Sequence, residues 1–157
     1  MEGDFVARLA SARIGATFNQ YADSVLRRER LRLYLVVRAD AKVVLVGEAA
    51  GYRGARVSGI AFGVEEDVLL WNVVPTHPGT GSSNRAPRRD EVEAAAPFLE
   101  EVLRGRSAFA VGRVAAGAMG AAYIRHPSHG GATAFEEGLE RAFATIPRRR
   151  AGVRRFL

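Results

Sequence analysis

The chain has 157 residues, 48% of them apolar and 25% charged, and its 23 basic and 17 acidic side chains give a formal net charge of +6. These proportions are those of a single globular domain and exclude a disordered or fibrous chain. The absence of cysteine excludes a disulfide scaffold, a cysteine nucleophile, a thiolate zinc site and an iron–sulfur cluster. No apolar run reaches the roughly 18 residues that span a bilayer, and the first residues lack the basic flank and apolar core of a signal peptide, so we expect an intracellular protein.

Hydrophobic periodicity predicts helical structure over the first 30 residues. Phe5 and Leu9 share one helical face, and after Gly15 the apolar residues between 18 and 26 continue the 3.6-residue period. Four short apolar runs follow, each ended by glycine, asparagine or a nearby proline. Because none of them alternates strictly between apolar and polar residues, we expect strands that are covered on both faces, over residues 42–47, 68–72, 107–112 and 121–125.

Helical patterns lie between or after these strands. They cover residues 88–103, 114–119 and 133–144, and the last begins with Thr133 as a predicted N-cap and Glu136 as its capping-box partner. Strands that alternate with helices favour an α/β fold, here a three-layer α/β/α domain around a central, mostly parallel four-stranded sheet. In such a fold, ligands bind at the carboxyl ends of the strands.

Three polar, glycine-containing loops leave the predicted strand ends, over residues 47–62, 72–87 and 126–131. Glycine lets the backbone approach a ligand closely, so these loops form the candidate site. The first loop has neither the phosphate-binding Walker sequence nor the dinucleotide fingerprint, because its glycines have other spacings. His126 and His129 lie in a loop rather than on a helix, so we expect no metal.

Two further features leave alternatives open. The basic tail, residues 147–157, contains five arginines, which are either a solvated tail or counter-ions for the phosphates of a nucleic acid. His77 lies in a loop before a proline and is predicted to be a surface residue.

Taken together and in this order, the three loops resemble the uracil-DNA glycosylase superfamily. Residues 47–64 have the length and pattern of the superfamily's first motif, and the opening Gly47-Glu48-Ala49 is similar to the Gly-Glu-Ala start of family 4 and related bacterial enzymes. Leu69-Leu-Trp-Asn72 resembles the strand whose last residue reads uracil, and Asn84-Arg85-Ala-Pro87 resembles the Asn-Arg-x-Pro of family 4. His126-Pro127-Ser128 matches the second motif, His-Pro-Ser.

The resemblance implies one uracil-DNA glycosylase-like domain over residues 1–157, in a monomeric, cytoplasmic protein of bacterial type that needs no cofactor. Its activity would be hydrolysis of the N-glycosidic bond of deoxyuridine in DNA, the first step of base-excision repair. The base is flipped out of the DNA into a pocket, because it cannot be reached in the stack. Negative charge then grows on uracil O2 as the bond breaks, so the site needs donors aimed at that oxygen.

The resemblance also implies roles for individual residues. His126 stabilises the leaving uracil and Glu48 positions or activates the water. The residues implied to bind substrate are Asn72, which pairs with uracil N3–H and O4, Phe62, which stacks on the base, and Gly47, Ala49 and Tyr52. The residues implied to contact DNA are Ser128, His129, Gly130, Arg85, Ser58 and Arg53. The structural alternatives are a turn-forming Asn72, a packed loop histidine at 126, an exposed turn carboxylate at 48 and a core phenylalanine at 62.

The chain departs from the family pattern in several places. Ala49 stands where family 1 has a water-activating aspartate, so the water is left to Glu48 or to electrostatics alone. Gly130 stands where family 1 inserts a leucine, which favours single-stranded or mismatched DNA because extrusion costs less there. The iron–sulfur cysteines of family 4 are missing. Only nine residues separate Phe62 from Asn72, so either one wall of the pocket is thinner or a segment is missing from the chain.

The single lysine, Lys42, lies at the start of a predicted strand and away from the loops, so we expect a monofunctional enzyme without a Schiff-base lyase step. Two other functions remain open. One is a glycosylase for another deaminated base, hypoxanthine or xanthine, and the other is a nucleic-acid-binding module without catalysis. A flavodoxin-like small-molecule binder has less support, because no phosphate-loop signature is present.

Overall fold

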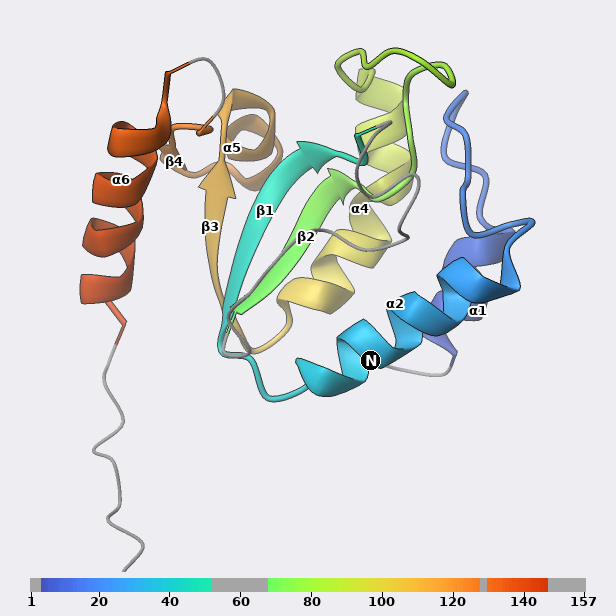
Figure 1. Cartoon of the computed structure of the whole chain (residues 1–157), viewed down its shortest axis with the longest axis horizontal. Helices are drawn as coiled ribbons and strands as arrows, with labels where there is room; N and C mark the ends of the chain where they lie inside the picture. The colour runs from blue at the N-terminus through green and yellow to red at the C-terminus, as the bar shows by residue number, and fades with distance from the viewer. Residues whose placement is uncertain (1–3, 52–67, 128–129, 147–157) are drawn as a thin grey trace, which may run out of the picture.

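The structure is a computed structural model that describes residues 4–51, 68–127 and 130–146 (Figure 1). Within these residues the helices are α1 (Phe5–Ser11), α2 (Val25–Val37), α4 (Arg89–Leu103), α5 (Arg113–Met119) and α6 (Ala132–Ala144). The strands are β1 (Val43–Ala49), β2 (Val68–Val74), β3 (Ser107–Val111) and β4 (Tyr123–Ile124). The four predicted strands are thereby confirmed, with β2 longer and β4 shorter than expected.

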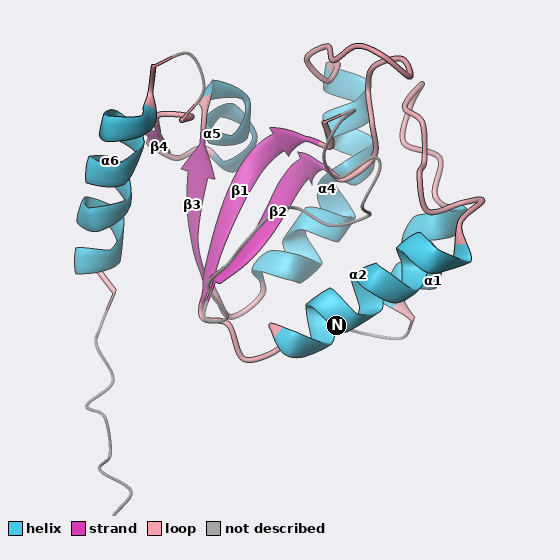
Figure 2. Ribbon diagram, in the orientation of Figure 1, coloured by secondary structure: helices cyan, strands magenta, loops and turns pink. Residues whose placement is uncertain are grey.

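The strands form one sheet in the order β2-β1-β3-β4, and all neighbouring strands are parallel (Figure 2). The register places Gly47 of β1 beside Asn72 of β2. Strand β4 pairs only with Ala110 and Val111, the last two residues of β3, which explains why it is so short. Because all strands run the same way, their carboxyl ends lie together at one end of the sheet, which we call its carboxyl edge. Their amino ends lie together at the opposite end, its amino edge.

The sheet carries apolar side chains on both faces. One face contributes Val44, Val46, Leu69, Trp71 and Ala110 to a cluster that also holds buried residues of α1, α2, α4 and α5. The other face contributes Val43, Leu45, Val68 and Val111, which pack with Phe135 and Leu139 of α6. The sheet therefore lies between two layers of helices, as the three-layer prediction requires, and this double cover explains why the strands show no polar alternation.

Helix α2 covers the free edge of β2, the outer strand of the sheet. The Tyr34 hydroxyl accepts a hydrogen bond from the Leu70 N–H at 2.7 Å and lies 3.1 Å from the Leu70 carbonyl oxygen, to which it donates. Arg38 Nε donates to the Val68 carbonyl at 3.1 Å. These side chains satisfy main-chain groups that would otherwise be open to pairing with another chain.

The first 30 residues form two helices rather than one continuous helical region. Between them, Gly15 has a positive φ of 52°, and the Asn19 side chain donates to the carbonyl oxygens of Leu9 and Ala12 at 2.8 and 3.0 Å. The predicted helical period is therefore wrong over residues 18–24, whereas Val25 and Leu26 do lie in a helix, α2. Side-chain hydrogen bonds from an asparagine to main-chain carbonyls hold this segment in an irregular conformation that periodicity does not reveal.

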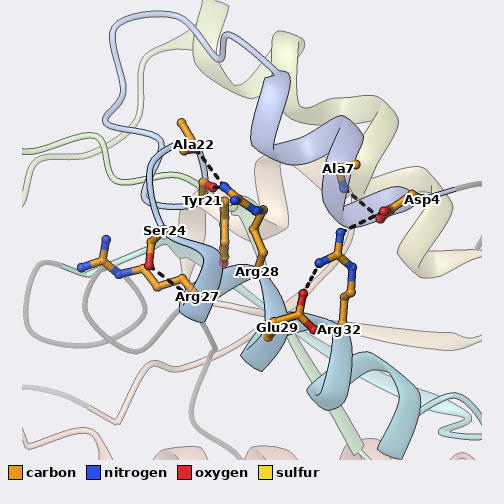
Figure 3. A network of polar contacts seen from close by, with 9 residues as sticks. All are labelled: Asp4, Ala7, Tyr21, Ala22, Ser24, Arg27, Arg28, Glu29 and Arg32. Carbon is orange, nitrogen blue, oxygen red and sulfur yellow. Dashed lines mark hydrogen bonds and ion pairs between the residues drawn. The ribbon is translucent and has the colours of Figure 1, made fainter.

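Polar side chains fix α2 against α1 (Figure 3). Asp4 and Ser24 accept hydrogen bonds from main-chain N–H groups in the first turns of α1 and α2, and so act as N-caps. Arg32 bridges Asp4, at 2.8 Å, and Glu29, at 2.5 Å. Arg28 donates to the carbonyl oxygens that precede α2. Capping and ion pairing, rather than an extended apolar stripe, define the start of α2.

Of the later helices, α4 agrees with expectation, whereas the start of α6 does not. Helix α4 continues through Pro97, and the Glu91 carboxylate accepts from the Arg88 N–H at its start, at 2.8 Å. Helix α6 begins at Ala132 with Gly131 as its N-cap and no side-chain cap. Thr133 thus lies inside the first turn, and its predicted capping box with Glu136 is wrong.

Candidate active site

A cavity of about 630 Å³ opens at the carboxyl edge of the sheet. Each of the four strands contributes to it: the lining residues are Gly47, Glu48 and Ala49 from β1, Asn72 from β2, Val111, Gly112 and Arg113 at the end of β3, and Tyr123, Arg125 and His126 at the end of β4. Parallel strands bring their carboxyl ends together, so residues far apart in the sequence meet here. The predicted site residues Gly47, Glu48, Ala49, Asn72 and His126 therefore surround one space.

A second cavity of about 290 Å³ shares part of this lining. It is bounded by Glu48, Ala49, Ala50, Gly51, Pro78, Asn84, Arg85 and His126. Glu48, Ala49 and His126 line both cavities, so the two spaces meet at these three residues. All three predicted loops thus contribute to one composite site. Gly130, in contrast, lines neither cavity among the residues that the structure describes, and it sits with a φ of 74° in the turn before α6.

The Asn72 side chain is held close to β1 by the absence of a side chain at Gly47. A Cβ atom placed on Gly47 would lie 2.8 Å from Asn72 Oδ1, which is closer than real Cβ atoms approach. Asn72 is half-buried beside Gly47, two residues before the end of β2. Gly47 therefore creates the space in which the Asn72 carboxamide lies at the cavity wall.

Arg85 is bound by a buried carboxylate. Its Nη1 and Nη2 atoms lie 2.8 and 2.5 Å from the two carboxylate oxygens of Glu91, whose side chain is fully buried. The Arg85 hydrogen bonds, together with the Arg88 N–H, hold the pKa of the Glu91 carboxyl below its ordinary value. The implied contact of Arg85 with DNA stays a prediction, and the structure adds that this guanidinium is fixed in place from within.

His77 is fully buried, so its prediction as a surface residue is wrong. Its ring nitrogens lie 2.7 Å from the carbonyl oxygens of Ala50 and Thr80, and its main chain pairs with Phe18. The ring therefore connects the end of β1 to the loop after β2, which carries Asn84 and Arg85. A loop histidine before a proline gives no sequence signal for such a role.

The sequence reasoning missed five residues that line the larger cavity, and three of them carry polar side chains: Arg113, Tyr123 and Arg125. Hydrogen bonding between Arg113 and Tyr123 raises the pKa of the Arg113 guanidinium. Arg125 immediately precedes His126, and Arg113 follows the last residue of β3 by two positions. The rule that ligands bind at the carboxyl ends of strands would have identified both arginines, had it been applied to β3 and β4 as well as to the glycine loops.

Several predicted site residues lie outside the residues that the structure describes. They are Tyr52, Arg53, Ser58, Phe62, Ser128 and His129, and the basic tail 147–157 lies outside as well. The short connection from Phe62 to Asn72 falls largely in the same unassigned part of the chain. Within residues 4–51, 68–127 and 130–146, no group of three or more histidine, aspartate or glutamate side chains is arranged to hold a metal ion.

The fold and the gathered polar groups define a ligand-binding α/β domain with its site at the carboxyl edge of a parallel sheet. The family model of the uracil DNA glycosylase superfamily matches residues 36–147. This match spans well over half of the chain, and the chain therefore belongs to the uracil-DNA glycosylase superfamily. Membership confirms the resemblance and the fold prediction, and it supports a glycosylase-type hydrolase that binds DNA.

No curated protein and no solved structure matches the chain. In the part of the chain that the structure describes, none of the helices combines the length and the apolar character that crossing a membrane requires. The assignment of substrate and residue roles therefore depends on the geometry of the site.

Proposed function

We propose that the protein is a monofunctional uracil-DNA glycosylase, which hydrolyses the bond between uracil and deoxyribose in DNA. The observation that carries this proposal is the meeting of Asn72, Glu48 and His126 around one cavity. The three side chains come from the ends of three different strands. They supply an amide, a carboxylate and an imidazole, which are the groups needed to recognise a pyrimidine, handle a water and stabilise a leaving anion.

Asn72 is the residue proposed to recognise the base. Its carboxamide has one accepting and one donating group, which match the N3–H and O4 of uracil. Cytosine presents the reverse pattern at these positions. The Asn72 carboxamide lies beside Gly47, where a Cβ would displace it. Discrimination between the two bases requires that this carboxamide present its accepting and donating groups in one orientation.

His126 and Glu48 are proposed to carry the chemistry. As the C1′–N1 bond breaks, its electron pair moves to uracil, and negative charge grows on O2 while the sugar becomes cationic. His126 donates a hydrogen bond to O2, an interaction of the kind that contributes about 10²- to 10³-fold to a rate. Glu48 accepts a proton from the water whose oxygen bonds to C1′, and the uracil anion is later protonated by solvent.

The position of Lys42 supports a reaction without a lyase step. This single lysine immediately precedes β1, at the amino edge of the sheet, whereas the cavity lies at the carboxyl edge. Gly47, the first residue of β1 that lines the cavity, is five residues beyond Lys42, a distance of about 16 Å along the strand. The Lys42 amine therefore cannot reach a C1′ carbon in the cavity, so the abasic product is left uncleaved.

The proposed substrate is uracil in single-stranded or mismatched DNA. Gly130 has no side chain to wedge into a duplex, so the cost of extrusion is not offset at that position. Unpaired or mismatched uracil lowers this cost. Base readout through Asn72 and electrostatic attraction of a chain with a net charge of +6 are both compatible with such substrates.

The test is excision from a labelled oligonucleotide that carries one uracil, either single-stranded, opposite guanine or opposite adenine, with alkali to cleave abasic sites. We expect cleavage of the single-stranded substrate to be fastest, followed by uracil opposite guanine and then by uracil opposite adenine. His126→Ala and Glu48→Gln should each lower the single-turnover rate by about 100-fold or more. Glu100→Gln is the matched control, because Glu100 is an exposed carboxylate on α4 and lines neither cavity.

Two results would contradict the proposal. If the protein binds these oligonucleotides without cutting them, the same assay with hypoxanthine and xanthine distinguishes another base specificity from a binding module. If cleavage occurs but is unaffected by His126→Ala, the assigned leaving-group role is wrong.

A further inference from the structure

Glu91 is a buried carboxylate that the proposed reaction does not use. It is the third residue of α4, and none of its side chain is exposed. Three donors converge on it: the two terminal nitrogens of Arg85 and the N–H of Arg88. A buried charge is retained only when it is paired in this way. We therefore ask what the groups paired with Glu91 do.

What Glu91 holds is a guanidinium at the wall of the smaller cavity. Arg85 uses the end formed by Nη1 and Nη2 for Glu91, and Nη1 also donates to the Ala86 carbonyl oxygen. Among the described residues, no hydrogen bond uses Nε. The side edge of the guanidinium, formed by Nε–H and the second N–H of Nη2, therefore keeps its two parallel donors, which match two oxygens of a phosphate.

The segment before α2 packs against the Glu91 side chain. A Cβ atom on Gly15 would lie only 2.6 Å from Glu91 Cγ, and Gly15 has a positive φ of 52°. The backbone at Gly15 thus packs directly on the Glu91 side chain. Gly15 lies outside the region that the family model matches, yet it contributes to the support of Arg85 through Glu91.

We propose that Glu91 is a positioning residue, which orients Arg85 so that its side edge binds a backbone phosphate of the DNA next to the extruded nucleotide. The inference rests on the proposed function for the identity of the substrate. Arg85 shares its cavity with Glu48 and His126, so a phosphate bound there is adjacent to the reacting sugar. Preorganisation by a buried partner removes part of the entropy cost of ordering a long side chain on binding.

The alternative is that the Glu91–Arg85 ion pair only stabilises the fold. The two possibilities predict opposite changes in DNA affinity when the charge of Glu91 is removed. Removing a negative charge from a DNA-binding protein strengthens binding if only the overall field matters. If Glu91 orients Arg85, removing its charge weakens binding instead. Glu101 provides a matched control, because it is a buried carboxylate on the same helix that pairs with an arginine, Arg8, at 2.6 Å, and it lines neither cavity.

The experiment measures the Kd for a single-stranded oligonucleotide with one uracil, in a His126→Ala background, over a series of salt concentrations. We expect Glu91→Gln to raise Kd about tenfold, and Arg85→Ala to raise it at least as much and to reduce the salt slope by about one. Glu91→Gln added to Arg85→Ala should have no further effect. Glu101→Gln should leave Kd unchanged or lower it. In the enzyme with His126 intact, the change in KM should exceed the change in kcat.

Arg85→Lys keeps the test decisive if Glu91→Gln does not fold. Lysine can still pair with Glu91, but it has no planar edge for two phosphate oxygens. We expect a protein that still folds, with a Tm lowered only by the loss of one hydrogen bond to Glu91, and a raised Kd. The proposal is overturned if Arg85→Lys binds DNA like the wild type, if Glu91→Gln tightens binding, or if its effect is the same with and without Arg85. Failure of uracil excision in the parent enzyme, with this coupling intact, would instead refute the proposed function alone.

Discussion

Arginine has different tasks at the two edges of the sheet. At the amino edge, Arg106 donates to three main-chain carbonyl oxygens at 2.8 to 3.1 Å, those of Ala39, Ala41 and Val102. Arg38 similarly donates to the Val68 carbonyl. At the carboxyl edge, Arg85, Arg113 and Arg125 line cavities. The first group completes the main-chain hydrogen bonding of the fold, and the second surrounds the space where a ligand fits.

This difference shows that residue type alone does not assign a role to an arginine. With 22 arginines in the chain, a count or a net charge does not separate structural cations from binding cations. Their acceptors do separate them. A guanidinium whose donors end on main-chain carbonyls stabilises the fold, whereas one with donors left over at a cavity can bind an anion. Substitutions at the two edges should therefore change different measurements.

The largest effect is expected at the carboxyl edge, for Gly47→Ala. The added Cβ would meet Asn72 Oδ1 at 2.8 Å, so the carboxamide must move away from its position. A displacement of about 1 Å in a recognition group can cost about 100-fold in rate, and we expect a loss of that size in kcat/KM for uracil excision. The measurement is excision from the single-stranded oligonucleotide, together with thermal unfolding.

Gly117→Ala is the matched control for this substitution. Gly117 lies in α5, and a Cβ there would meet nothing within 4 Å. Alanine in a helix interior is more stable than glycine by about 0.5–1 kcal/mol, so Tm should rise slightly without loss of activity. Equal activities of the Gly47 and Gly117 variants would show that the orientation of Asn72 does not matter for excision.

The amino edge should respond in stability instead. Arg106→Ala removes the donor to three carbonyl oxygens, and we expect the free energy of unfolding to fall by about 2 kcal/mol. Urea denaturation measures this change. The kcat/KM of the folded fraction should equal that of the wild type. A loss of activity without loss of stability would mean that the two edges are not functionally separate.

The fold could largely be predicted from the sequence, because strongly apolar runs separated by helical stripes leave few alternatives. The strand at residues 42–47 corresponds to β1, and the helix at 88–103 to α4. The segment from Gly15 to Ser24 could not be predicted. Its conformation depends on Asn19 hydrogen bonds and on a carboxylate, Glu91, that is 76 residues further along the chain.

The site was partly predictable because it lies where the ends of parallel strands converge. Gly47, Asn72 and His126 stand at strand ends, and parallel strands bring such residues together whatever their separation in sequence. The burial of His77 depends on how its loop packs against the end of β1, because the ring contacts the carbonyl oxygen of Ala50, 27 residues earlier in the chain. No local pattern encodes such contacts, so only the structure shows them.

A smaller effect is expected for Arg125→Ala, at the cavity wall beside His126. Arg125 makes no ion pair with the residues that the structure describes, and it is exposed. Loss of one phosphate contact should raise Kd about fivefold and reduce the salt slope by about one. Tm should not change. A fall in Tm with unchanged Kd would place Arg125 with the structural arginines of the amino edge.

The smallest effect concerns the pH dependence of stability, through Glu91. Hydrogen bonds from Arg85 lower the pKa of this carboxyl from its ordinary value of 4.5, so the ionised form is favoured in the folded state. Its contribution to stability is therefore fully present above pH 4.5 and is lost as the pH falls through the lower, folded-state pKa. We expect the difference in unfolding free energy between wild type and Glu91→Gln to be constant near neutral pH and to shrink below pH 4.5, as measured by urea denaturation. A difference that persists undiminished to pH 3 would mean that the shape of the side chain, not its charge, supports Arg85. In that case an uncharged side chain at position 91 would be enough to hold Arg85. The arginines that line the cavities would then differ from those that bind main-chain carbonyls only in their position, not in being paired with a buried charge.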